Sequence, residues 1–222
     1  MRALPGLMLW AWERSEDLRR LSPDVGVAFL AQTITLHDNR VAVDRRRQPL
    51  QISPSTAIVA TTRVEAPGLD GRPLTDDQAT EVARLIQRTS HLPRVAAVQI
   101  DFDATLSQRS FYRTLIAALR RELPPAVPIS ITALASWCVE DRWLHELDVD
   151  EIVPAIFRMG PSNERFRKLG AGSAWPETRC RGAIGTSLDE PTALDRVPGR
   201  VYVFSPRPWD SPAITAARLV RK

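Results

Sequence analysis

The chain has 222 residues, of which 44% are hydrophobic and 25% charged, and its formal net charge is +4. This composition fits one globular domain over residues 1–222, large enough for a compact eight-stranded α/β barrel but too short for a second full domain. The basic residues are nearly all arginines scattered among acids, so we expect no binding to nucleic acid. The one compact basic run, Arg45 to Arg47, is predicted to be a solvated loop.

No stretch reaches the roughly 18 apolar residues that a bilayer span needs. Met1 to Met8 is too short for an export signal and lacks a small-residue cleavage site, so the compartment stays unknown, with the cytoplasm as default. Two cysteines make no disulfide framework, and the three histidines show no zinc-site spacing. We therefore expect no metal and no cofactor, and we expect a monomer.

Eight apolar segments recur along the chain, most of them separated by helix-like or loop segments. This alternation predicts a parallel sheet with crossover helices, and continuous apolar runs are typical of strands buried on both faces. The predicted strands are Gly6 to Trp12, Val25 to Ala31, Thr56 to Arg63, Val95 to Asp103, Pro128 to Trp137, Ile152 to Met159, Arg181 to Ser187 and Arg200 to Ser205.

Two connections carry clear helical signals. Thr75-Asp76-Asp77-Gln78 has the pattern of a capping box and predicts a helix that runs to Gln87. Ser107 to Leu123 has apolar residues at helical spacing and stops at Pro124-Pro125. Shorter helices are predicted at Ser15 to Leu21, Asp141 to Leu147, Asn163 to Leu169 and Pro212 to Val220.

Two other connections depart from the barrel pattern. Thr33 to Val43 alternates on both sides of a polar turn, which predicts a β-hairpin after the second strand. The link from Pro191 to Pro198 is short for a full helix. The predicted fold is therefore α/β, a single irregular (β/α)8 TIM-like barrel with a β-hairpin insertion.

Two carboxylates stand at the end of the fourth predicted strand. Residues two apart on a strand share a face, so Gln99, Asp101 and Asp103 should project together. Carboxylates so placed are about 6 to 7 Å apart along the backbone, close to the spacing used in glycoside hydrolysis. In one low-dielectric pocket, repulsion would raise one pKa and leave a proton donor beside an anion. Alternatively, both aspartates pair with Arg63 or Arg158 and only hold the barrel mouth together.

The other strand ends are also polar and aromatic, and barrel enzymes place their sites there. Indole faces at this rim could stack on sugar rings, although core packing is the alternative for each tryptophan. Arg158 either neutralises the aspartates, which we favour, or meets an anionic group of a substrate. The candidate binding residues are Trp10, Trp12, Glu13, Arg63, Gln99, Trp137, Arg158 and Trp209, and the further rim acids are Glu65 and Glu190.

Several chemistries lack their sequence signatures. No G-x-S-x-G elbow, Walker loop or G-x-G-x-x-G fingerprint occurs, which leaves acyl transfer, phosphoryl transfer and dinucleotide chemistry unsupported. No histidine falls at a predicted strand end, as metal-dependent barrel hydrolases require. Cys138 should lie beyond the fifth strand and Cys180 before the seventh, at opposite ends of a barrel, so we expect no disulfide between them.

Specific sequence blocks run along nearly the whole chain. They are Trp12-Glu13-Arg14 with Glu16-Asp17-Leu18, Val25 to Leu30, Gln99 to Ala104, Ser130 to Cys138, Phe157 to Gly160 and Tyr202 to Trp209. Together they resemble the bacterial domain-of-unknown-function family numbered 3142. This resemblance implies a barrel distantly similar to glycoside hydrolases and implies no established activity.

More distantly, Asp101 to Thr105 resembles the D-x-x-D-x-D-x-E strand end of chitinase-like barrels, with Thr105 in place of the catalytic glutamate. The same segment is also similar to the D-x-E strand end of muramidase-like barrels, with Asp103 in place of the glutamate. A proton donor would then be Asp103, Glu65 or Glu190. We therefore predict a barrel that acts on a glycan, with Asp103 as general acid and Asp101 as base, nucleophile or orienting group. The alternative is a catalytically inactive barrel that binds carbohydrate or a protein partner.

Overall fold

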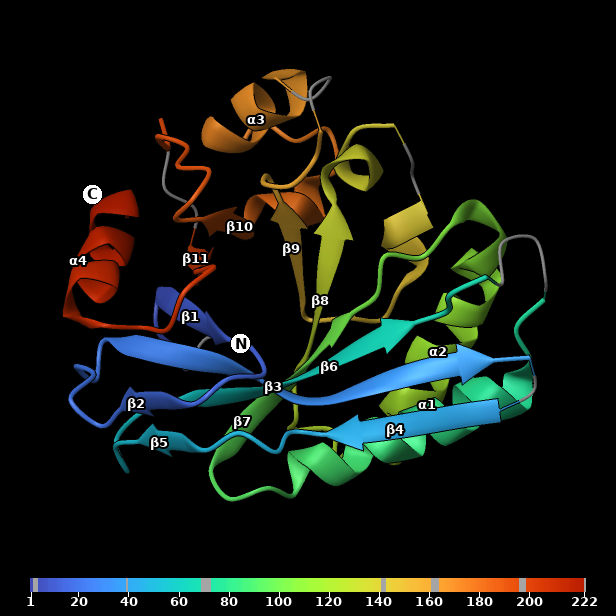
Figure 1. Cartoon of the computed structure of the whole chain (residues 1–222). Coiled ribbons are helices and arrows are strands. Elements are labelled where there is room, and N and C mark those ends of the chain that lie inside the picture. The colour runs from blue at the N-terminus through green and yellow to red at the C-terminus, as the bar shows by residue number, and fades with distance from the viewer. Residues whose placement is uncertain are drawn as a thin grey trace.

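The computed structural model describes residues 1, 4–38, 40–68, 73–140, 143–160, 164–195 and 199–221. Eight parallel strands pair in the order β1-β3-β6-β7-β8-β9-β10-β11, and β11 pairs with β1 to close a barrel (Figure 1). All eight predicted strands and the barrel fold are therefore confirmed. The strands are β1 (Leu7–Ala11), β3 (Val25–His37), β6 (Ile58–Glu65), β7 (Val95–Asp101), β8 (Ile129–Leu134), β9 (Glu151–Ala155), β10 (Ala183–Ser187) and β11 (Arg200–Phe204).

The α-helices lie outside the barrel, and Figure 1 shows α1 and α2 side by side beneath the β3–β6–β7 part. Their bounds are α1 (Asp76–Ser90), α2 (Arg109–Glu122), α3 (Glu164–Ala171) and α4 (Ser211–Val220). The predicted capping box is confirmed, because Thr75 Oγ1 accepts from the Gln78 amide at 3.2 Å and Gln78 Oε1 accepts from the Thr75 amide at 3.0 Å. None of the helices in these ranges combines the length and apolar character of a membrane span.

Short 3-10 segments replace or extend some predicted helices. Segment η1 (Leu106–Gln108) leads into α2, and η3 (Trp143–Glu146) stands where a helix from Asp141 was predicted. Residues 141, 142 and 163, which begin two of the predicted helices, lie outside the described residues. So do residues 196–198 of the short link before β11, and its described part contains no helix.

The predicted hairpin is confirmed. Strand β3 continues beyond the barrel and pairs antiparallel with β4 (Arg40–Arg45); residue 39, which stands between them in the sequence, is not among those described. The helix predicted at Ser15 to Leu21 is wrong, because this segment forms β2 (Glu16–Leu18), which pairs in parallel with β5 (Leu50–Ile52). Tertiary hydrogen bonds of Glu16 with Arg14 and with the Trp209 amide hold this segment in the extended conformation, in place of the helix that its pattern favours.

Alternation along the strands separates two apolar layers. On β1, Met8 and Trp10 point into the barrel, whereas Leu7 and Leu9 pack outward. The interior layer also contains Ala28, Val59, Ala97, Val153, Tyr202 and Phe204. The outer layer lies between the strands and the helices and includes Val82 and Ile86 of α1 and Leu115 and Leu119 of α2. Packing on both faces explains why the strands are almost uniformly apolar.

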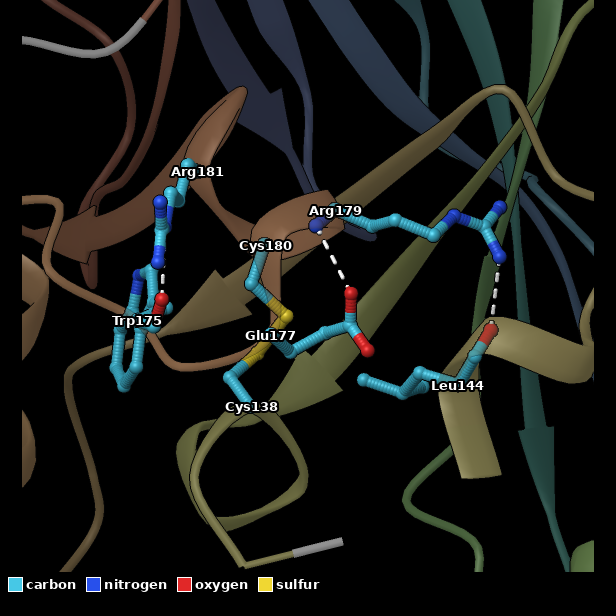
Figure 2. Close-up of a disulfide and its surroundings, with 7 residues drawn as sticks. All are labelled: Cys138, Leu144, Trp175, Glu177, Arg179, Cys180 and Arg181. Atoms are coloured by element: carbon cyan, nitrogen blue, oxygen red, sulfur yellow. Dashed lines mark hydrogen bonds between the residues drawn. A yellow bond between two sulfur atoms is a disulfide. The ribbon is translucent and has the colours of Figure 1, made fainter. Parts of the chain in front are cut away.

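Cys138 and Cys180 form a disulfide, so the sequence prediction was wrong (Figure 2). Cys138 lies in η2 (Ala135–Cys138) after β8, Cys180 lies in η4 (Thr178–Arg181) before β10, and their Cα atoms are 6.0 Å apart. The prediction failed because both residues lie in the outer layer beside β9, not at the two ends of the barrel axis. There the Glu177 amide donates to the Cys138 carbonyl at 3.1 Å, which brings the two connections around β9 together.

Candidate functional site

A cavity of about 390 Å³ opens at the carboxyl ends of the barrel strands. This is the end at which barrel enzymes carry their sites. Six of the candidate residues meet in it, namely Trp10, Trp12, Arg63, Asp101, Asp103 and Arg158. Thr132, Ala133, Leu134, Ala155, Phe157 and Phe204 complete the lining.

Asp101 is the last residue of β7, and strand pairing places Arg63 of β6 directly beside it. Arg63 Nη1 lies 2.6 Å from Asp101 Oδ2, and Thr132 Oγ1 of β8 donates to Asp101 Oδ1 at 2.7 Å. Both carboxylate oxygens therefore have a donor, and only 10% of the side chain is exposed. Arg63, and not Arg158, is the cation that neutralises this aspartate.

Asp103 lies just beyond the strand, with Oδ2 3.6 Å from Arg63 Nη2 and 55% of its side chain exposed. Desolvation and the neighbouring Asp101 carboxylate raise the pKa of Asp103, and Arg63 opposes this shift. Glu65 Oε1 accepts from Arg63 Nε at 2.9 Å. Burial works against the charge of Arg63, but the three carboxylates outweigh it and raise the arginine pKa above its usual value. The surroundings of Asp103 therefore shift the equilibrium of this carboxyl group towards its protonated form.

The opposite side of the cavity is an aromatic wall made of Trp10, Trp12, Phe157 and Phe204. The rings of Phe157 and Phe204 stack with centroids 5.7 Å apart, and Trp12 meets Phe204 edge-on at 6.3 Å. Trp12 and Phe157 are only partly buried, so part of each ring faces the cavity. Partly exposed aromatic faces of this kind stack on apolar or sugar surfaces.

A buried hydrogen-bond chain lies below the cavity and holds Trp10. The indole Nε1 donates to Gln99 Oε1 at 2.8 Å, and Gln99 Nε2 donates to Ser130 Oγ at 3.1 Å. Ser130 donates in turn to Glu151 Oε2 at 3.0 Å, and Glu151 forms an ion pair with Arg200 at the amino end of the barrel. Gln99 is fully buried, so it positions Trp10 and does not itself line the cavity.

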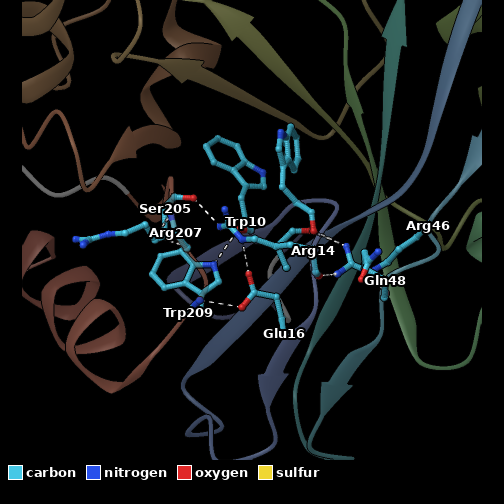
Figure 3. Close-up of polar contacts among 10 residues, drawn as sticks. Trp10, Arg14, Glu16, Arg46, Gln48, Ser205, Arg207 and Trp209 are labelled. Atoms are coloured by element: carbon cyan, nitrogen blue, oxygen red, sulfur yellow. Dashed lines mark hydrogen bonds and ion pairs between the residues drawn. The ribbon is translucent and has the colours of Figure 1, made fainter.

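The turn after β1, which presents Trp12, is held by the polar contacts of Figure 3. Buried Glu16 accepts from Arg14 Nε at 2.7 Å and from the Trp209 amide at 2.8 Å. Arg46 Nη1 donates to the Trp12 carbonyl at 2.6 Å. The solvated-loop prediction is therefore wrong for Arg46, because it stabilises the backbone of this turn. Trp209 belongs to the same support and is 4% exposed.

The structure does not bring the remaining candidates into the cavity. Trp137 is 2% exposed and packs edge-on against Trp143 at 4.9 Å, because β8 ends at Leu134 and the strand alternation does not reach it. Glu13 accepts from two backbone amides, at residues 47 and 48. Glu190 accepts from the Arg158 amide at 3.1 Å and from an arginine at residue 167. Glu65 lines an adjoining hollow that shares Arg63 and Asp103 with the cavity.

Thr132, Phe157 and Phe204 line the cavity, but the sequence analysis did not single them out. Thr132 and Ser130 alternate on one predicted strand, and Phe204 stands next to the last residue of another, so both carried a positional signal. Phe157 also carried a positional signal, because it stands two residues before the end of the predicted sixth strand, although β9 itself ends at Ala155. Among the described residues, no group of three or more His, Cys, Asp or Glu side chains could hold a metal ion.

No family model matches the sequence, and no curated protein matches it significantly. Solved structures with a similar fold include an endo-β-N-acetylglucosaminidase from Cordyceps militaris, with a TM-score of 0.55 and 8% identity over 98% of this chain and 90% of that chain. A GH113 β-1,4-mannanase gives a TM-score of 0.51 and 9% identity over 98% and 97%. The chain is a TIM barrel. Identities this low show the fold and not an activity.

Proposed function

We propose that the cavity binds a glycan and that Asp103 acts on it as a general acid. The observation that carries this proposal is a carboxyl group with a raised pKa that shares one cavity with partly exposed aromatic rings. A raised pKa keeps a carboxyl group available to protonate a leaving oxygen, and aromatic rings hold sugars. The two similar structures belong to enzymes named for the glycans that they act on, which supports the same class of ligand.

In this proposal the two aspartates have different tasks. Asp101 has donors on both oxygens, so it is better suited to orient Arg63 and to supply negative charge than to attack a sugar carbon. Asp103 is the more exposed of the two and reaches the open part of the cavity. Negative charge near the sugar favours the oxocarbenium-like transition state of glycoside hydrolysis. Trp12 and Phe157 would hold the ring that reacts.

A second candidate function is glycan binding without hydrolysis. Arg63 forms ion pairs with both Asp101 and Asp103, as expected of structural counterions. Thr105 is the N-cap residue immediately before η1, and its amide donates to Gln108 Oε1 at 3.0 Å, so the position that carries the acid in chitinase-like barrels has a structural task here. This candidate keeps the same cavity and ligand class and differs only in turnover.

The test measures binding and turnover separately on one panel of plant, fungal and bacterial oligosaccharides. The parent chain is compared with Asp103→Asn, Asp101→Asn and the control Asp44→Asn, which changes an aspartate with 72% side-chain exposure. General acid catalysis predicts that Asp103→Asn lowers turnover by about a hundredfold or more while binding is retained. Binding without turnover in the parent would support the second candidate. If no glycan binds, both functions are wrong.

A further inference from the structure

Arg158 lines the cavity beside the aromatic wall, and its guanidinium lies 4.6 Å from the centroid of the Phe204 ring. Among the described residues it makes no side-chain hydrogen bond, and the one carboxylate oxygen within ion-pair distance is Asp189 Oδ2 at 4.0 Å. Its side chain is 57% exposed. A guanidinium that stacks on a ring keeps its N–H edge free, and this edge matches a carboxylate with two parallel hydrogen bonds.

The backbone at Arg158 supports this placement. Its φ angle is +53°, in the left-handed region that residues other than glycine seldom adopt, at a cost of about 1 to 3 kcal/mol. The Arg158 amide donates to both carboxylate oxygens of Glu190, at 3.1 and 3.2 Å, and Glu190 is held by Arg167 at 2.6 Å. The fold therefore fixes this residue in an unfavourable conformation at the cavity rim.

The charges around the cavity are divided between its two sides. Asp101, Asp103 and Glu65 converge on Arg63, so that cation is already neutralised. Arg158 follows β9, and β8 separates β9 from the β7 strand that carries the aspartates. Two strand spacings amount to about 10 Å, which leaves room for an anionic group at Arg158 away from Asp101 and Asp103.

From these observations we infer that Arg158 forms an anion subsite, and that the glycan bound in the cavity carries a carboxylate, as in a chain that contains uronic acids. This inference rests on the proposed function and narrows its substrate class. The carboxylate would accept two hydrogen bonds from the free edge of the guanidinium while the sugar ring lies against Trp12 and Phe157. Among the described residues it would compete with Asp189, whose weak surface ion pair with Arg158 contributes little.

The experiment measures binding of uronic-acid oligosaccharides by calorimetry, each compared with its neutral methyl ester. Galacturonate, glucuronate and mannuronate series are used, together with neutral oligosaccharides. The variants are Arg158→Gln, Arg158→Lys and the control Arg94→Gln. Arg94 is also an arginine with a positive φ, at 66°, but it immediately precedes β7, at the opposite end of the barrel. Thermal unfolding of each variant confirms that it is folded.

We expect the parent to bind at least one acidic oligosaccharide about tenfold to a hundredfold more tightly than its ester. Arg158→Gln should bring the ratio of acid to ester affinity close to one, Arg158→Lys should restore part of this ratio, and Arg94→Gln should leave it unchanged. Added salt should reduce the preference of the parent. Equal binding of acids and esters, or binding of neutral glycans alone, would overturn the anion subsite and leave the proposed function standing. Absence of all binding would overturn both.

Discussion

The ion pair between Arg63 and Asp101 should contribute measurably to the stability of the protein, because the structure places the two charges in contact at the cavity. Arg63→Gln removes the cation 2.6 Å from Asp101 Oδ2 and leaves a carboxylate of 10% side-chain exposure with Thr132 as its donor. Breaking a fully buried pair in this way destabilises a protein by about 3 to 5 kcal/mol. Because this site opens to a cavity and Arg63 is 32% exposed, we expect about 2 to 3 kcal/mol.

The reverse substitution should have a smaller effect. Asp101→Asn keeps an acceptor for Thr132, and Arg63 retains Glu65 at 2.9 Å and Asp103 at 3.6 Å as partners. We expect a loss of about 1 to 2 kcal/mol from this change. The double variant should then lose less than the sum of the two single variants, by about 1.5 kcal/mol, because neither partner is left alone.

The assay is urea unfolding of the four proteins at neutral pH with linear extrapolation to water. Arg47 and Asp44 provide the matched control cycle, because they form an ion pair of 3.5 Å with side chains 82% and 72% exposed. Their coupling should stay below about 0.5 kcal/mol. If the losses of unfolding free energy caused by Arg63→Gln and Asp101→Asn add to within about 0.5 kcal/mol in the double variant, the two residues are not coupled. The electrostatic account of the cavity is then wrong.

Three further predictions concern the disulfide, the acid and the indole. Reduction, or serine at Cys138 and Cys180 together, should lower the free energy of unfolding by about 4 kcal/mol for a sequence separation of 42 residues, measured by denaturation with and without reductant. Since the folded pKa of Asp103 lies above 3.8, the contribution of Asp103 to the unfolding free energy should fall as pH rises from 3.8 through the folded pKa. Asp103→Asn should lack this pH-dependent contribution, which solvent screening keeps below about 1 kcal/mol. Unfolding of the parent and of Asp103→Asn at pH 3 and at pH 7 measures the difference. Gly185→Ala would place Cβ 2.7 Å from the Trp10 ring and should destabilise the barrel by about 1 to 3 kcal/mol, with a shifted tryptophan emission; unchanged emission and stability would contradict this packing.

Local sequence pattern was enough to predict the eight barrel strands and the hairpin, but not the short strands β2 and β5. Apolar runs of five or more residues and period-two alternation are properties of the strand itself, so they survive in any tertiary setting. The capping box at Thr75 and the stop at Pro124-Pro125 are local in the same sense and located α1 and α2. Position at a strand end also brought Asp101 and Asp103 to the correct end of the barrel.

Contacts between distant segments decided the rest. Strand register places Arg63 beside Asp101, whereas the guanidinium of Arg158 lies over the Phe204 ring. No local sequence pattern predicts which of the two arginines pairs with the aspartate. The early end of β8 turned Trp137 into the core, and the fold of the two connections around β9 brought Cys138 to Cys180. The sequence thus determined which segments form the barrel strands and which way their side chains alternate, because both depend on neighbours along the chain. Only the tertiary structure decided which charges pair and which rings face the cavity, because these depend on where strands end and what packs beside them.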